Sequence, residues 1–173
     1  TDAIIAASSM VTALQTIASR NVDPMQQVVV SVCTVQTDST AHNVIPQVVI
    51  LKGTVRSMDP KVQDFVETRL AEVVEGTALA LGARAELHYS RGYPVTINAP
   101  ENTTFAAEVA AQVSGRVDAE TAPLMGAEDF SFMLNERPGA YIFLGNGDTA
   151  MVHHPAYNFD DHAIPFGSSW YAA

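Results

Sequence analysis

Three of the five histidines of this 173-residue chain lie within the stretch MVHHPAYNFDDHAIPFG at residues 151–167. Two of them, His153 and His154, are adjacent, and a pair of aspartates precedes the third. Imidazole and carboxylate groups can bind a metal ion, transfer protons or simply solvate a loop. Neighbouring side chains of an extended chain point in different directions, so only one of the two adjacent histidines is expected to face a given ion. A catalytic metal site needs at least three protein ligands, so this stretch by itself is not a complete one.

A second cluster with possible chemistry is the glycine-containing acidic loop PLMGAEDFSF. Gly126 permits the backbone to approach a ligand closely. Glu128 and Asp129 could cap the turn that follows or could line a site. The sequence pattern leaves both interpretations open.

A third candidate pair consists of Asn43, in AHNVIP, and Arg56, thirteen residues later. If the strands on either side of Asn43 pair as neighbours, Asn43 enters the second strand and Arg56 leaves it, up to about 40 Å away at full extension. The two residues would then serve different ends of a site, or different subunits. The alternative is a turn asparagine and a solvated arginine.

The first half of the chain must position Asn43 and Arg56, and its pattern alternates helices and strands. Apolar spacing predicts helices that end before NVDP and that span residues 58–82, the second with Asp59 as its cap. β-Branched runs predict strands at 26–37, 47–57 and 83–94. The order α-β-β-α-β, with both helices on one face of the sheet, resembles a ferredoxin-like unit whose first strand is missing.

The second half must position Glu128 and the histidines. Its sequence pattern differs from that of the first half, with the change after Tyr93. A helix is predicted over 98–115 with Phe105, Val109 and Val113 inward, and a short strand over 140–147. We therefore expect two domains, at residues 1–93 and 94–173.

Composition excludes several classes of function. Nineteen acidic residues against nine basic ones give a formal net charge of -10, which argues against nucleic acid as a partner. No apolar run approaches the roughly 20 residues of a membrane span, and no signal peptide is visible, so a cytoplasmic protein is expected. The single Cys33 cannot form an internal disulfide, and it is expected to be a small buried thiol.

Consecutive motifs of the chain resemble a known family. They are TDAIIAASSMVTALQTIASRNVDP, AHNVIPQVVILKGTVRS, MGAEDFSF, PGAYIFLGNG and HHPAYNFDDHAIPFG. Together they are similar to the metal-dependent amidohydrolases of the hippurate hydrolase and N-acyl-amino-acid amidohydrolase branch of the aminoacylase/carboxypeptidase G2-like superfamily. The resemblance covers nearly all of the chain. It implies a partial lid or dimerisation domain, followed by the C-terminal segment of an α/β metallohydrolase domain.

The resemblance also implies roles for individual residues. His153 matches the last ligand of a pair of divalent metal ions, which could be manganese, zinc or cobalt. Asn43 and Arg56 match lid positions that reach the substrate carboxylate and acyl group, often across a dimer. Gly126 and Glu128 belong to a motif that lines the site. The remaining ligands and the catalytic glutamate of the family lie upstream of these motifs.

The resulting expectation is an α+β or α/β portion of a dinuclear-metal amidohydrolase that cleaves N-acyl amino acids or small peptides. Its expected partners are the missing N-terminal half and a second copy of the protein, paired through the lid. Alone, the chain is expected to be inactive and to bind metal weakly or not at all. The alternative is a non-catalytic dimerisation or binding module derived from such an enzyme. One motif departs from the family, because Asp160 follows Phe159 where asparagine is usual.

Overall fold

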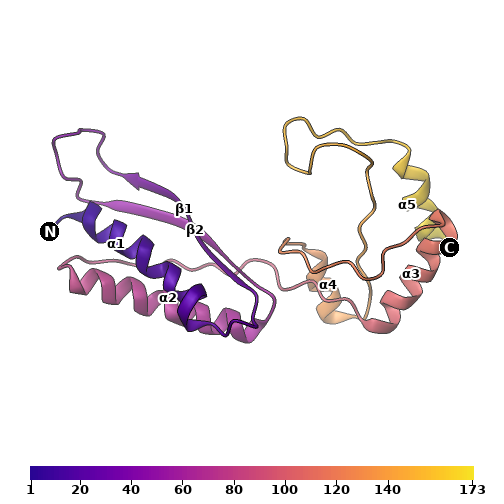
Figure 1. Ribbon diagram of the computed structural model, residues 1–173, viewed down its shortest axis with the longest axis horizontal. Coiled ribbons are helices and arrows are strands. Elements are labelled where there is room, and N and C mark those ends of the chain that lie inside the picture. Colours follow the sequence, from indigo (N-terminus) through magenta and orange to yellow (C-terminus); the bar gives the residue numbers. More distant parts are fainter. The chain divides into compact units, whose positions relative to one another are not determined.

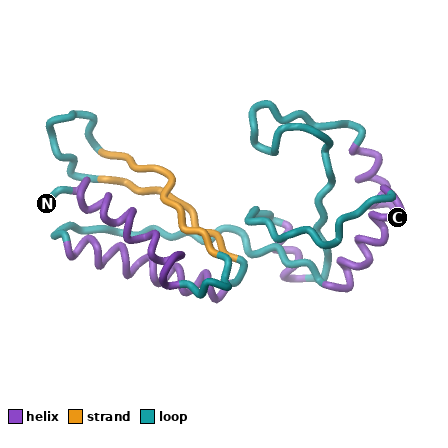
Figure 2. The backbone as a smooth tube through the Cα atoms, viewed as in Figure 1, coloured by secondary structure: helices purple, strands orange, loops and turns teal.

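The computed structural model describes all residues from 1 to 173, which form two compact units, Thr1–Val95 and Thr96–Ala173 (Figure 1). The predicted division at residue 93 lies two residues before this boundary. Helices and strands make up the first unit, whereas the second combines helices with long irregular segments (Figure 2). None of the helices combines the length and the apolar character needed to cross a bilayer.

The first unit opens with helix α1, Ala3–Thr16, which continues into a π-helical turn, η1, Ile17–Asn21. The Asp2 carboxylate caps α1 by accepting a hydrogen bond from the Ile4 backbone N–H at 2.9 Å. Apolar residues at helical spacing, Met10, Leu14 and Ile17, enter the core of the unit. The predicted first helix is therefore present.

Strands β1, Val28–Thr37, and β2, Val49–Ser57, form an antiparallel hairpin. Helices α1 and α2 lie on one face of it (Figure 1). The pairing shifts by one residue between Val32 and Thr34, which leaves Cys33 in a bulge. Cys33 is exposed, so its predicted burial was wrong. The reason is the alternation of the strand, because Val30 and Val32 point to the core and Cys33 points to the other side.

Helix α2, Pro60–Ala80, confirms the predicted second helix. The Asp59 carboxylate accepts a hydrogen bond from the Lys61 N–H at 2.7 Å, and Pro60 occupies the first turn. The apolar stripe of α2 closes the core of the unit and consists of Val66, Leu70, Val73, Val74 and Ala78. Phe65, which the pattern assigned to this stripe, is instead 45% exposed.

The predicted third strand, residues 83–94, does not form a hydrogen-bonded ladder. Its side chains nevertheless alternate like those of a strand, because Ala83, Ala85, Leu87 and Tyr89 pack against the core and the residues between them are exposed. A strand requires a paired neighbour, and β2 is paired only with β1. The predicted third strand is therefore wrong as a paired strand, although the segment covers the core with alternate side chains.

The second unit contains helices α3, Pro100–Ser114, α4, Phe130–Glu136, and α5, Ala163–Ala172. Helices α3 and α5 are in contact, and the Trp170 indole N–H donates a hydrogen bond to the Ala106 carbonyl at 3.0 Å. Phe105 was predicted to point inward but is 63% exposed, because α3 buries Ala106 and Val109 instead. No strand forms at 140–147, where one was predicted.

We expect Gly53→Ala to destabilise the first unit by about 1–3 kcal/mol, the cost of an overpacked site. A Cβ atom at Gly53 would lie 2.1 Å from the Ser31 carbonyl oxygen across the hairpin, and that backbone group cannot move away without disturbing the bulge. Gly76→Ala in α2 is the matched control, because its Cβ would meet nothing within 4 Å. The control is expected to stabilise the helix by about 0.5–1 kcal/mol. Urea unfolding measures both, and equal midpoints for the two variants would contradict the expectation.

Candidate functional site

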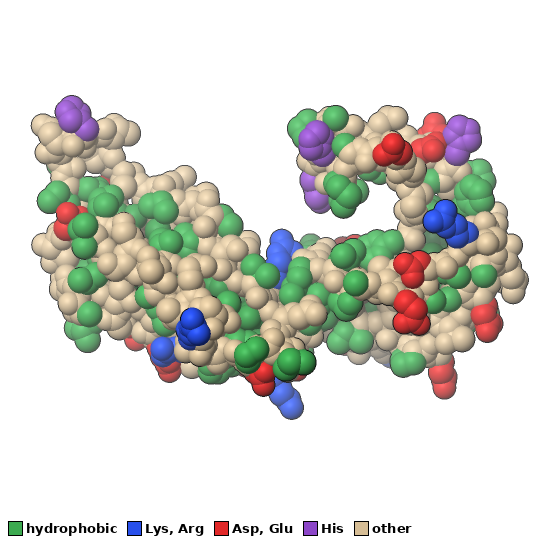
Figure 3. All heavy atoms as spheres, viewed as in Figure 1, with side chains coloured by type: hydrophobic (Ala, Val, Ile, Leu, Met, Phe, Trp, Pro, Cys, Tyr) green, Lys and Arg blue, Asp and Glu red, His purple; other side chains and the backbone are tan.

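The histidine-rich stretch forms an irregular loop that precedes α5 in the second unit. Histidine and acidic side chains gather on this loop in the space-filling view (Figure 3). A turn closed by the His154 N–H on the Met151 carbonyl at 3.0 Å is followed by a second, closed by the Tyr157 N–H on the His154 carbonyl at 2.9 Å. These turns fix the backbone on both sides of His154.

The two adjacent histidines have different surroundings. His153 is the only non-glycine residue of the chain in the left-handed region, with φ at 69°, and its side chain is exposed. His154 has ordinary backbone geometry, and its Nδ1 accepts a hydrogen bond from the Ala156 N–H at 3.0 Å. Left-handed backbone at a non-glycine residue costs of order 1–3 kcal/mol and occurs often at functional sites. Both residues are exposed, and the structure distinguishes them by the left-handed backbone of His153 and by the hydrogen bond that the His154 ring makes within the loop.

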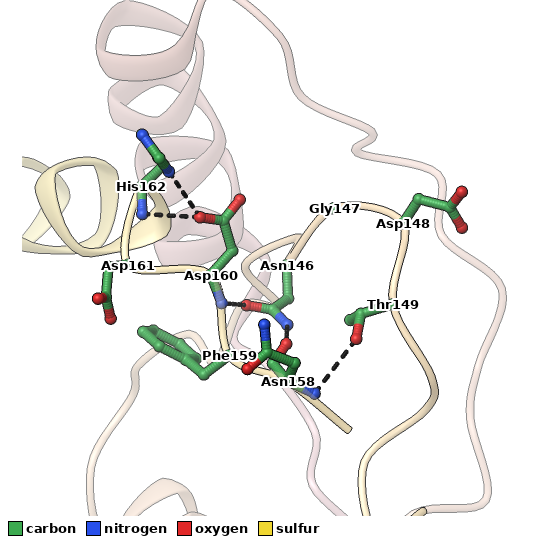
Figure 4. Close-up of a pocket in the computed structure, with 9 residues that line it drawn as sticks. All are labelled: Asn146, Gly147, Asp148, Thr149, Asn158, Phe159, Asp160, Asp161 and His162. Atoms are coloured by element: carbon green, nitrogen blue, oxygen red, sulfur yellow. Dashed lines mark hydrogen bonds and ion pairs between the residues drawn. The ribbon is translucent and has the colours of Figure 1, made fainter. Parts of the chain in front are cut away.

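A polar pocket lies at the base of this loop and is lined by two segments, 146–149 and 158–162 (Figure 4). The Asn146 side chain joins the segments, since its Oδ1 accepts from the Asp160 N–H at 2.7 Å and its Nδ2 donates to the Asn158 carbonyl at 2.8 Å. The Thr149 hydroxyl accepts from the Asn158 N–H at 3.2 Å. The side-chain amide of Asn146 therefore links the two ends of the loop that carries the histidines.

Asp160 and His162 interact with each other. Asp160 Oδ1 accepts from the His162 backbone N–H at 3.0 Å and lies 2.8 Å from the His162 ring Nδ1 (Figure 4). The hydrogen bond from the His162 N–H, reinforced by the His162 ring, lowers the pKa of the Asp160 carboxyl. This carboxylate is thus ionised, and its Oδ1 is paired within the loop.

The donor atoms of the 173 residues do not by themselves make a dinuclear metal site. No group of three or more His, Cys, Asp or Glu side chains lies close enough together to hold one ion. Catalytic sites of this type use three or more protein ligands in fixed geometry. The exposed imidazole of His153 fits one position in such a set, and further ligands are needed for the rest.

Glu128, in the acidic loop before α4, accepts hydrogen bonds from three residues. The Tyr141 hydroxyl donates to Glu128 Oε2 at 2.9 Å, and the Phe130 N–H donates to Oε1 at 3.4 Å. The Glu128 carbonyl accepts from the Ser131 hydroxyl at 2.6 Å, at the start of the helix. The hydrogen bond from Tyr141 lowers the pKa of Glu128, and the same contact raises the pKa of Tyr141.

Gly126 lies two residues before Glu128 and is exposed. A Cβ atom there would meet nothing within 4 Å, and its φ is not in the left-handed region. The fold of the chain therefore does not itself require glycine at this position.

Tyr141 and Asn98 are two residues of this cluster that the sequence analysis missed. Asn98 Nδ2 donates to the Tyr141 carbonyl at 2.9 Å, and the Tyr141 N–H donates to Asn98 Oδ1 at 2.8 Å. The partners are 43 residues apart in the sequence, so no local pattern links them. The only sequence signal is a tyrosine inside the apolar run AYIFL, where a buried hydroxyl would need a partner.

The other two candidate residues lie in the first unit. Asn43 is exposed in the turn between β1 and β2, and Arg56 is the penultimate residue of β2, opposite Val29. Arg56 follows Val49, the first residue of β2, by seven positions, or about 23 Å along the strand. The hairpin thus pairs as predicted and places Asn43 and Arg56 toward opposite ends of β2. Glu128 and His153 lie in the second unit, whereas Asn43 and Arg56 lie in the first. The four candidate residues therefore do not form a site within either unit alone.

The arrangement of the chain is also found in solved structures of hydrolases, one of which is described as metal-binding. A dinuclear metal-binding peptidase of the M20 family from Bacillus subtilis superimposes with a TM-score of 0.77 and is 32% identical, over 99% of this chain and 44% of that one. A Staphylococcus aureus protein assigned as an aminohydrolase gives a TM-score of 0.83 at 29% identity, over 98% of this chain and 44% of that one.

Sequence comparison identifies the family. The model of peptidase family M20/M25/M40 matches residues 5–173, and the chain belongs to this family. Hippurate hydrolase of Campylobacter jejuni is 35% identical over 99% of the chain. N-acetyl-L-cysteine deacetylase of Bacillus subtilis is 36% identical over 94% of it. The chain spans 45% and 39% of the lengths of these two relatives and corresponds to the C-terminal portion of such an enzyme.

Proposed function

We propose that the longer protein to which these residues correspond hydrolyses the amide bond between an acyl group and an amino acid. The observation that carries this proposal is the shared chemistry of the relatives. Hippurate is an N-acylated glycine, and other relatives are named as deacetylases of N-acetylcysteine and N-acetyldiaminopimelate. All three kinds of enzyme remove an acyl group from an amino acid nitrogen. We extend this substrate class, and not one particular acyl group, to the present protein.

His153 is proposed as one ligand of a pair of divalent metal ions. Its support is the left-handed backbone, the exposed ring and the match to the last ligand of the resembling family. The remaining ligands are proposed to come from residues outside these 173, as is the glutamate that takes a proton from the attacking water. Manganese, zinc or cobalt would suit such a site and would supply Lewis-acid polarisation of the amide carbonyl. On this account the 173 residues alone are inactive and bind metal weakly.

The other candidate residues are proposed to bind the substrate. Arg56 offers a planar fork of N–H donors that matches a carboxylate, and Asn43 offers an amide for the acyl group. Gly126 leaves open space where a ligand can approach the backbone, and Glu128 presents an ionised carboxylate from the same loop. Because Asn43 and Arg56 lie toward opposite ends of β2, they are proposed to act on different parts of a site or in different subunits.

The function is tested with the full-length enzyme on a panel of N-acyl amino acids, with matched acyl esters and unmodified dipeptides as comparison substrates. We expect turnover of the N-acyl amino acids, loss of turnover after chelation, and recovery on addition of manganese, zinc or cobalt. Hydrolysis that survives complete removal of metal would contradict the proposal. The alternative, a non-catalytic module, predicts no turnover with any metal.

We also propose that the full-length protein is a homodimer formed through the first unit. Its two-stranded sheet leaves an unpaired edge on each strand, and such edges associate readily with other strands. Closed two-fold dimers are the commonest assemblies of soluble proteins. Light scattering should report twice the monomer mass over a wide concentration range. A constant monomer mass would exclude this assembly.

A further inference from the structure

We propose that Tyr141 is a positioning residue that holds the Glu128 carboxylate in the orientation in which it meets the substrate. The inference rests on the proposed function, because it assumes that Glu128 lines the substrate site. Its structural basis is a side chain whose hydroxyl contacts Glu128 at 2.9 Å and whose backbone and ring are both held in place.

Tyr141 is fixed by contacts of two kinds. The Asn98 amide binds both the N–H and the carbonyl of Tyr141, at 2.8 and 2.9 Å. The ring contacts two phenylalanines, with its centroid 5.8 Å from that of Phe130 and 5.5 Å from that of Phe143, the latter in an edge-on arrangement. Such aromatic pairs stabilise a single ring orientation. The hydroxyl therefore reaches Glu128 from a point that the surrounding residues define.

The hydrogen bond from Tyr141 is not needed to begin helix α4. The Glu128 carbonyl already accepts from the Ser131 hydroxyl at 2.6 Å and from the Ser131 N–H at 3.3 Å. Glu128 Oε1 accepts from the Phe130 N–H, which is one of the unpaired donors of the first helical turn. Local capping thus uses the backbone and one carboxylate oxygen. Tyr141 binds the other oxygen, Oε2, and ties it to a segment thirteen residues away.

The carboxylate retains capacity for a ligand. An ionised carboxylate has about four acceptor positions; Tyr141 and the Phe130 N–H take one each, and Asp129 also interacts with the Glu128 carboxylate, which leaves part of this capacity open. Glu128 is only half-buried, so the remaining capacity is accessible. Tyr141 acts on the charge as well as the geometry, because its hydrogen bond lowers the pKa of Glu128 and keeps the carboxylate ionised at lower pH.

The test compares Tyr141→Phe, Glu128→Gln and the double variant in the full-length enzyme. Loss of a hydrogen bond to a charged group corresponds to about a tenfold change in binding, so we expect Tyr141→Phe to raise KM about tenfold with kcat changed less than about threefold. The double variant should be no worse than Glu128→Gln, because Tyr141 acts only through Glu128. Tyr171→Phe is the matched control. It removes a hydroxyl from an exposed residue of α5, and its KM should not change.

A second readout does not depend on turnover. Carbon-13 titration of the Glu128 carboxyl in the full-length enzyme should show a higher pKa in Tyr141→Phe than in wild type, and no change in Tyr171→Phe. An unchanged KM, or losses that add in the double variant, would overturn the positioning role while leaving the proposed amidohydrolase activity intact. If the wild-type enzyme cleaves no N-acyl amino acid, the proposed function fails. In that case an unchanged Glu128 pKa in Tyr141→Phe would overturn the positioning role as well.

Discussion

Replacing His153 with alanine in the full-length enzyme is expected to lower kcat/KM on an N-acyl amino acid by more than about 100-fold. Residues that merely support a metal ligand typically change activity or affinity by 10- to 100-fold, so removal of the ligand itself should cost at least the upper end of this range. The loss should be accompanied by weaker metal binding, measured by equilibrium dialysis. Excess metal should restore part of the activity.

His154→Ala is the control for this prediction, because it removes a neighbouring imidazole that the structure assigns to the loop. Its ring Nδ1 accepts from the Ala156 N–H, and the loss of that contact should cost stability of the loop and less than about tenfold in activity. If His154→Ala were the more damaging of the two variants, the assignment of the ligand to His153 would be wrong.

Arg56→Lys is expected to lower kcat/KM by about 10- to 100-fold, and Arg56→Ala by at least as much. Lysine keeps the charge but offers a single ammonium in place of the two parallel N–H donors with which arginine grips a carboxylate. The effect should appear mainly in KM, because a substrate carboxylate is bound equally before and during the reaction.

Lys52→Ala is a suitable control for Arg56, because it removes another exposed cation from the same strand. Its expected change is below about twofold. A substrate ester that lacks the free carboxylate should be insensitive to Arg56→Lys. A specificity constant that is unchanged in both Arg56 variants would rule out this role.

The helices could be predicted because their signals are local. Asp59 and Pro60 mark the start of α2, and the spacing of its apolar residues marks its buried face. Phe105 shows the limit of such reasoning. It shares helical spacing with Val109, yet Ala106 is the residue that is buried, and its carbonyl accepts a hydrogen bond from Trp170. Which residues of an apolar helix face become buried depends on the element that packs against it. For α3 that element is α5, which the sequence of α3 alone does not reveal.

The strands show the same limit more strongly. Residues 83–90 show the alternating burial of a strand, but the predicted strand over 83–94 does not form, because pairing depends on a neighbouring backbone. Cys33 lies in an apolar run, and its exposure follows from its position on the outer side of β1. The sequence showed that the neighbours of Cys33 are apolar. The alternation of side chains along β1 determines which of them face the core.

For the candidate site, the sequence motifs supplied hypotheses: the roles of His153 and Glu128 follow from the family resemblance and stay predictions. The different surroundings of His153 and His154 became visible only in the backbone angle and one hydrogen bond. The contacts of Tyr141 with Asn98 and Glu128 join positions 43 and 13 residues apart. Such contacts arise from the tertiary fold and have no signature in either motif.

The central claim is that His153 contributes to an active site completed by residues outside this chain. The most direct measurement is an assay of the 173-residue protein with manganese or zinc on a hippurate-like substrate, alone and mixed with the separately produced N-terminal portion. We predict no turnover alone, because loss of a general base costs about 100- to 10,000-fold even when metals are bound. We predict recovery on mixing, and His153→Ala should abolish that recovery. Robust turnover or tight, stoichiometric metal binding by the 173 residues alone would contradict the account.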